Sequence, residues 1–253
     1  MVAPKKFKRI CVGCGALDSK MNKEHFWPAW LIERTGTNKT SVRFSAEKRI
    51  NPKALVVPLC IECNSDFGRE LESPVSRIFA ELEDKKGLSD VGAELLVRWL
   101  WKFEGLFWRF TNPEGRHPSN QTLRQRVLQP IGQSRTKLSV AVSLVAKINP
   151  RFADAPMGLD SWNIANPVFV AGVFSRIAIM VLEREFEELI PPKFGIYRLA
   201  DANAPDRNAK LFYPPIGFRD CVEAVSETVD IALYLSHAHD LQARNRASGH
   251  IST

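Results

Sequence analysis

Two Cys-x-x-Cys pairs constrain this chain more than any other feature of its sequence. Cys11 and Cys14 form the first pair, and Cys60 and Cys63 form the second. Zinc takes four ligands in a tetrahedron, and two thiolates three positions apart on a tight turn reach the same ion. Gly13, inside the first pair, lets such a turn fold back on itself. The four cysteines therefore predict one zinc site, which is structural because four thiolates leave no open position for water.

A disulfide framework is the other common use of paired cysteines, and the composition argues against it. The chain has 253 residues, 45% of them hydrophobic and 25% charged, which suffices for an ordinary core. No apolar run approaches the roughly 20 residues that span a bilayer, and the basic start MVAPKKFKRI leads directly into the first cysteine pair. These features predict a cytoplasmic protein without a membrane segment. The fifth cysteine, Cys221, is expected to be a small buried apolar residue.

The positive charge suits an anionic partner. The formal net charge is +7, and counterion release from a phosphate backbone is the commonest reason for such an excess. Four basic residues stand just before the first cysteine pair: Lys5, Lys6, Lys8 and Arg9. They form an arm that is placed to touch a nucleic-acid backbone, although a solvated arm explains them equally well.

The residues around the cysteines resemble a known family. Glu24 and His25 stand between the pairs, Pro28 follows shortly, and the second pair runs directly into Asn64. This pattern over about residues 8–80 resembles the HNH endonucleases, also described as the ββα-metal or treble-clef family. The resemblance implies an N-terminal treble-clef zinc finger with a core of two strands and a helix, and nucleic acid as partner, with DNA favoured by analogy.

The resemblance also implies a role for each residue. His25 matches the general base that activates water, while Glu24 and Asn64 match the residues that hold a catalytic Mg²⁺ or Mn²⁺. The residue types suit hydrolysis of a phosphodiester bond. A bound cation neutralises charge on the phosphate, an imidazole accepts a proton near neutral pH, and oxygen ligands suit both ions.

One family position is not matched. The family's middle asparagine usually lies about five residues before the third cysteine, where this chain has Leu55, and Asn51 lies further upstream, followed by Pro52. In the family that asparagine mainly fixes the loop that carries the base. Its loss therefore puts the positioning of His25 in doubt and leaves the cation site intact.

Other interpretations of these residues stay open. Glu24 and His25 also fit a surface pair on a purely structural zinc knuckle, and Asn64 taken alone fits a helix N-cap better than a ligand. Asp66 offers a further carboxylate for the metal site, but we prefer to interpret it as an early-helix residue that is favoured by the helix dipole. Two rival functions follow: a non-catalytic zinc-finger protein that binds nucleic acid, and a zinc-stabilised protein-interaction module.

The chain changes character near residue 85. We expect an α+β protein with a zinc-stabilised HNH-like nuclease domain over residues 1–85 and a mixed helix-and-strand domain over residues 86–253. Residues 83–90 are expected to be a linker or a helix end, residues 92–110 a helix, and residues 137–148 a strand with Val140, Val142, Leu144 and Ala146 on one side. Residues 167–190 predict a strand and then a buried helix, and further short strands are predicted at 194–201, 210–218 and 229–237. The second domain is expected to recognise substrate, a protein partner or a small ligand, or to mediate self-association.

Aromatic and basic residues outside the motif have mostly structural interpretations. Trp27, Trp30 and Leu31 are expected to anchor the finger, and the aromatic residues of the 92–110 helix to lie in a core. Arg98 and Lys102 are expected on a solvated face of that helix, with contact to phosphate as the alternative. His237 and His239 are expected on one edge of a strand, without a second metal site.

Overall fold

The computed structural model describes residues 10–17, 20–37, 42–43, 49–112, 121–147 and 169–247. Its elements are β1 (Met21–His25), α1 (Ala29–Arg34), β2 (Val42–Arg43), β3 (Arg49–Ile50), η2 (Pro52–Ala54), β4 (Val56–Cys60), α2 (Ile61–Phe67), η3 (Gly68–Glu72), α3 (Ser73–Glu83), α4 (Asp90–Thr111), α5 (Leu123–Leu128), η4 (Gly132–Lys137), β5 (Leu138–Lys147), β6 (Val170–Phe174), β7 (Ile177–Glu183), η6 (Arg184–Leu189), β8 (Gly195–Arg198), β9 (Ile216–Asp220) and α6 (Cys221–Ala247). The expected α+β class is confirmed. The basic arm at residues 5–9 lies outside the described residues.

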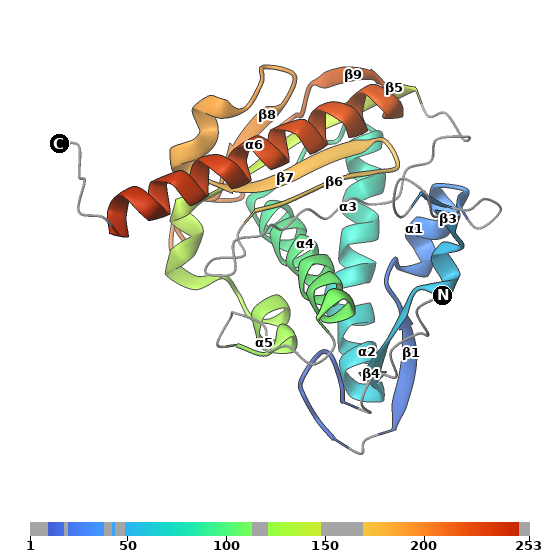
Figure 1. Ribbon diagram of the computed structural model, residues 1–253. Coiled ribbons are helices and arrows are strands. Elements are labelled where there is room, and N and C mark those ends of the chain that lie inside the picture. The colour runs from blue at the N-terminus through green and yellow to red at the C-terminus, as the bar shows by residue number, and fades with distance from the viewer. Residues whose placement is uncertain are drawn as a thin grey trace.

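A five-stranded sheet forms the centre of the later part of the chain. Its order is β6-β7-β5-β8, and β9 pairs with β5 as the parallel partner in an otherwise antiparallel sheet. Helix α6 crosses one face, and α3 and α4 lie against the other (Figure 1). Both faces are therefore buried. Along β5, Val140 and Val142 join the core on the α4 side, whereas Ala141 and Val145 join the core under α6.

The sheet departs from the sequence predictions in two places, and its double burial explains the second. The strand at 137–148 is confirmed as β5, but Ala146 is exposed, just after the point between Leu144 and Val145 where the register with β9 shifts. The second half of 167–190 was expected to be a buried helix and is strand β7 followed by the short 3₁₀ segment η6. A strand that is buried on both faces is a continuous apolar run, which periodicity alone does not distinguish from a buried helix.

The predictions for the last segments had mixed outcomes. The strand predicted at 194–201 is confirmed as β8, and the one predicted at 210–218 is confined to β9 and an isolated bridge between Leu88 and Phe212. The strand predicted at 229–237 is wrong, because these residues belong to helix α6. Its β-branched and aromatic side chains favoured a strand, whereas the buried positions Ala224, Thr228, Ala232 and Leu235 recur at helical steps. Cys221, at the start of α6, is buried as predicted.

The N-terminal part is built from a hairpin and a long helical run. Strands β1 and β4 pair antiparallel, with His25 opposite Val56 and Met21 opposite Cys60. Helix α2 begins directly after β4 and continues through η3, a π-helical turn, into α3. Strands β2 and β3 form a separate antiparallel pair. The end of the hairpin formed by Met21 and Cys60 therefore lies next to the first turn of α2, and His25 and Val56 lie at its other end.

One hydrophobic core crosses the boundary expected near residue 85. The ring of Phe26 lies 5.8 Å from that of Phe103 and 6.3 Å from that of Phe107, and Phe79 lies 5.3 Å from Trp99. The expected connection at 83–90 is confirmed, since α3 ends at Glu83 and Ser89 caps α4. The core position predicted for the anchor residues of the finger and the aromatic residues of α4 is confirmed for Trp27, Leu31, Trp99, Trp101 and Phe103, whereas Trp30, Phe107, Trp108 and Phe110 are half-buried.

Among the described residues, none of the helices contains a stretch that is both long and apolar enough to span a bilayer.

Candidate functional site

The four paired cysteines meet in space. Cys11 and Cys14 lie in the turn closed by the bridge between Ile10 and Leu17, Cys60 ends β4, and Cys63 lies in the first turn of α2. Their four sulfur atoms all lie within 4.8 Å of one another, and the Sγ atoms of Cys14 and Cys60 are 3.9 Å apart. A tetrahedron with zinc–sulfur bonds of about 2.3 Å separates sulfur atoms by about 3.8 Å. The cluster is therefore compatible with a structural zinc site.

Backbone hydrogen bonds hold the thiols in this arrangement. The N–H of Cys60 donates to Sγ of Cys11 over 3.2 Å, and the N–H of Cys63 donates to Sγ of Cys60 over 3.4 Å. The N–H of Gly15 donates to the carbonyl of Cys11 over 2.8 Å and closes the first turn. Hydrogen bonds of this kind stabilise thiolates, which are the form that binds a metal.

The thiols differ in how readily they ionise. Burial raises the pKa of Cys63 and of Cys14 above the ordinary value. Burial also acts to raise the pKa of Cys11, but hydrogen bonds from the backbone of Cys60 and Cys14 outweigh it and lower that pKa. Each thiolate disfavours ionisation of its neighbours, so a bound cation would supply the positive charge that lets all four thiols lose their protons.

The three residues of the expected catalytic constellation come from neighbouring elements. Glu24 and His25 end β1, Asn64 lies in α2 directly after Cys63, and α2 packs against β1. The Nδ1 atom of His25 is buried and has no hydrogen-bond partner among the described residues. The side chain of Asn64 likewise makes no hydrogen bond within that part of the chain. The four cysteines form the one cluster of three or more His, Cys, Asp or Glu ligands that the described ranges contain.

Glu24 has a partner that the sequence did not indicate. Its Oε1 accepts a hydrogen bond from Nζ of Lys102 over 3.1 Å, and the same Nζ donates to Oε1 of Glu72 over 2.7 Å. The side chain of Lys102 is 1% exposed, so the solvated face expected for it is wrong. Lys102 follows the buried Trp99 by three residues and therefore lies on the apolar side of α4. Its position in the helix, and not its residue type, indicates that it is buried.

Burial by itself acts to lower the pKa of Lys102. The charges of Glu72 and Glu24, and the hydrogen bonds that Lys102 donates to them, outweigh burial and raise this pKa. Lys102 is therefore an ammonium ion inside the core.

Arg98 is also not on a solvated face. Its Nε donates to the carbonyl of Val127 over 2.7 Å, and its Nη2 donates to the carbonyl of Leu128 over 2.9 Å. Arg98 thus satisfies carbonyls at the end of α5, a task that fits its forked guanidinium better than contact with phosphate.

Two interpretations of α2 need correction. Cys60, not Asn64, is the N-cap of this helix, because its sulfur accepts from the N–H of Cys63. Asp66 lies in the last turn of α2 and not early in the helix, so the helix dipole does not explain it. Its carboxylate pairs with Arg69 over 3.0 Å and with Arg124 of α5.

The unmatched asparagine position has a backbone contact in its place. Phe26 directly follows His25, and its N–H donates a hydrogen bond to the carbonyl of Leu55 over 2.8 Å. Asn51 caps η2 by accepting from the N–H of Lys53 over 2.9 Å. A main-chain bond therefore ties the segment before β4 to the end of the strand that carries His25.

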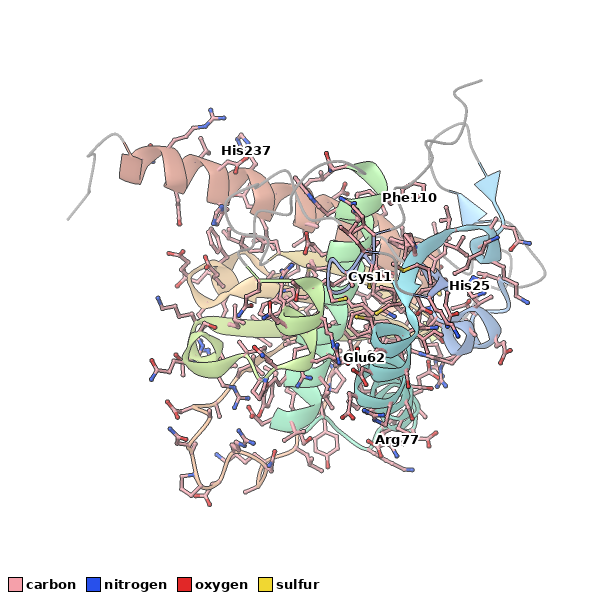
Figure 2. All side chains as sticks on the ribbon, turned by 90° about the horizontal axis from the view of Figure 1, so that it is seen from below. Cys11, His25, Glu62, Arg77, Phe110 and His237 are labelled. Atoms are coloured by element: carbon pink, nitrogen blue, oxygen red, sulfur yellow. The ribbon has the colours of Figure 1, made fainter. Side chains whose placement is uncertain are left out.

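No protein-family model, curated protein or solved structure matches this chain. Its function is inferred from its own residues. The histidines of α6 lie apart from the site, since Figure 2 shows His237 and His25 on opposite sides of the molecule with Cys11 between them. They lie on a helix and not on a strand, and the ring of His239 packs 5.4 Å from that of Phe169.

Proposed function

We propose that this chain is a divalent-metal-dependent endonuclease of the HNH type, built on a treble-clef finger, that hydrolyses phosphodiester bonds in DNA. The proposal rests on the position and surroundings of His25. It ends the first strand of a strand–strand–helix unit that is braced by four clustered thiols, and its buried Nδ1 has no partner among the described residues. A histidine that serves only a scaffold normally has its buried nitrogen paired.

The proposal assigns a structural role to zinc and a catalytic role to a second metal ion. Zinc on Cys11, Cys14, Cys60 and Cys63 holds the finger together, whereas Mg²⁺ or Mn²⁺ is held by Glu24 and Asn64. The donor set fits, because Oε2 of Glu24 and the side chain of Asn64 make no hydrogen bond to a described residue. When bound, the cation neutralises charge that develops on the phosphate.

His25 supplies the proton acceptor. Because Nδ1 is enclosed, the proton of the attacking water goes to Nε2. The bond between the N–H of Phe26 and the carbonyl of Leu55 fixes the backbone next to His25, as the family's middle asparagine would otherwise do.

A second function, binding nucleic acid without cleavage, is favoured by one observation. Lys102 already places a positive charge 3.1 Å from Oε1 of Glu24, where a catalytic cation would have to compete with it. In that case the zinc finger binds the anionic backbone of a nucleic acid and does not cleave it. Nothing in the described contacts favours a pure protein-interaction module.

The experiment compares the purified protein with two variants on supercoiled plasmid in Mg²⁺ or Mn²⁺. We expect cleavage by the wild type and a loss of about a hundredfold or more for His25→Ala, since a general base contributes that much or more. His237→Ala, which removes an exposed histidine of α6, should cleave like the wild type. Plasmid binding without cleavage supports the second function. If the protein neither binds nor cleaves the plasmid, the protein-interaction module is the function that remains.

Metal analysis tests the finger separately. We expect about one zinc ion per chain in the wild type and its loss in Cys63→Ser. A wild-type protein that contains no zinc after purification contradicts the finger and with it the nuclease.

A further inference from the structure

Lys102 lies between two carboxylates that differ in the number of hydrogen bonds they accept. Glu72 is fully engaged, because Oε1 accepts from Lys102 and Oε2 accepts from the indole N–H groups of Trp30 over 2.8 Å and Trp99 over 3.0 Å. Glu24 is half engaged, because Lys102 bonds only Oε1 and its side chain is 16% exposed. Glu72 therefore anchors the lysine, and the lysine in turn holds one oxygen of Glu24.

The charges of the three groups do not cancel. One ammonium between two carboxylates leaves a net charge of −1 on the triad, and a buried charge without compensation is costly. The Glu72 side chain is held between Trp30 of α1 and Trp99 of α4 and is 9% exposed, whereas the Glu24 side chain is 16% exposed. Of the two carboxylates, Glu24 is the one with an oxygen, Oε2, that makes no hydrogen bond to a described residue, so the residual negative charge lies on that oxygen.

We propose that Lys102 is a positioning residue for the cation site: anchored by Glu72, it holds Oε1 of Glu24 so that Oε2 is directed to the divalent cation. This inference rests on the proposed nuclease function. It assigns a role in the site to helix α4, which lies outside the residues 8–80 that carry the family resemblance. A partner that orients a metal ligand typically changes metal affinity by about ten- to a hundredfold when it is removed.

Mn²⁺ affinity of the zinc-loaded protein, measured from the paramagnetic resonance signal of free Mn²⁺, tests the inference without relying on activity. We expect Lys102→Met to weaken Mn²⁺ binding about tenfold or more. We also expect no further weakening when Lys102→Met is added to Glu24→Gln, because Lys102 acts through Glu24. Lys193→Met is the matched control, since Lys193 also joins two glutamates, Glu223 over 2.7 Å and Glu227 over 2.5 Å, and it should bind Mn²⁺ like the wild type.

A second variant covers the case in which Lys102→Met does not fold. Glu72→Gln keeps the size of the side chain and removes the charge that anchors Lys102, and it should also weaken Mn²⁺ binding. Circular dichroism and zinc content establish that each variant is folded.

The outcomes separate the inference from the function on which it rests. Mn²⁺ binding that depends on Glu24 but is unchanged or tighter in folded Lys102→Met and Glu72→Gln overturns the positioning role and leaves the nuclease intact. A tighter result would mean that Lys102 competes with the cation. A wild type that binds no Mn²⁺, or a Glu24→Gln variant that binds as the wild type does, overturns the cation site itself.

Discussion

Gly13 and Gly15, in the turn that carries the first cysteine pair, are glycines for different reasons. A Cβ at Gly13 would lie 2.9 Å from Sγ of Cys63 and 3.2 Å from the side chain of Leu59. Gly15 has open space around it but adopts a φ of +78°, which other residues rarely reach. The close approach at Gly13 allows the two halves of the thiol cluster to meet.

Gly13→Ala should loosen the thiol cluster. The added methyl group pushes Cys63 away, and we expect a loss of about 1–3 kcal/mol in unfolding free energy together with faster transfer of zinc to a competing chelator. Gly68→Ala is the control, because a Cβ there meets nothing within 4 Å on a helical backbone. It should be neutral or stabilise by up to about 1 kcal/mol. Zinc retention equal to the wild type in Gly13→Ala would contradict the close packing.

At the scale of elements, helices α4 and α5 are joined through Arg98. The guanidinium bonds the carbonyls of Val127 and Leu128, which the short helix α5 leaves without partners at its end. Helix α5 in turn reaches the finger, since the N–H of Arg124 donates to the carbonyl of Gly13 over 2.8 Å. Arg98 therefore supports the thiol cluster through α5.

Arg98→Met should destabilise this connection. The variant keeps an apolar stem but leaves two partly buried carbonyls unpaired, which costs about 1–3 kcal/mol in unfolding free energy measured by denaturant titration. Arg77→Met changes an exposed arginine of α3 and should stay within about 0.5 kcal/mol of the wild type. Equal stability of both variants would show that water satisfies the carbonyls of α5.

The segment η6 is held to the sheet by Glu187. Its carboxylate accepts from the hydroxyl of Ser139 on β5 over 2.5 Å and pairs with Arg198 on β8. Burial acts to raise the pKa of Glu187, but hydrogen bonds from Arg198 and Ser139 outweigh it, so the pKa lies below the ordinary 4.5. A lowered pKa means that the stabilisation is present above pH 4.5 and is lost as the pH falls through the folded-state pKa.

Glu187→Gln should therefore lower the melting temperature at pH 7 by more than at pH 3. Thermal unfolding of both proteins across that range measures the difference, which should shrink as the pH drops below 4.5. A difference that stays constant with pH would assign the effect to packing and not to the charge of Glu187.

At the scale of the whole molecule, the finger and the later helices share their core and their charges. Phe26 packs against Phe103 of α4, and Lys102 of the same helix compensates Glu24 and Glu72. Removing the later part of the chain exposes this apolar surface and leaves a nearly enclosed carboxylate without its cation.

A fragment of residues 1–85 should consequently not fold by itself. We expect the zinc-loaded fragment to show no cooperative thermal transition by circular dichroism, while the whole chain unfolds cooperatively. A transition of the fragment close to that of the whole chain would establish the N-terminal part as an independent domain.

The sequence alone determined the features that depend on local chemistry. The spacing of Cys11, Cys14, Cys60 and Cys63 predicted their cluster, because two thiols on one turn must point to the same place. The helix over 92–110 and the strand over 137–148 followed from the periodicity of their apolar residues.

The tertiary structure decided what depends on partners far away in the chain. Residues 177–183 are a strand because layers on both sides bury them, and 229–237 are a helix because only one side of that segment meets the sheet. Lys102 looks like a surface residue in the sequence, since a buried ammonium is tolerated only where carboxylates meet it. Those carboxylates, Glu24 and Glu72, come from the other half of the chain, and no local pattern indicates them.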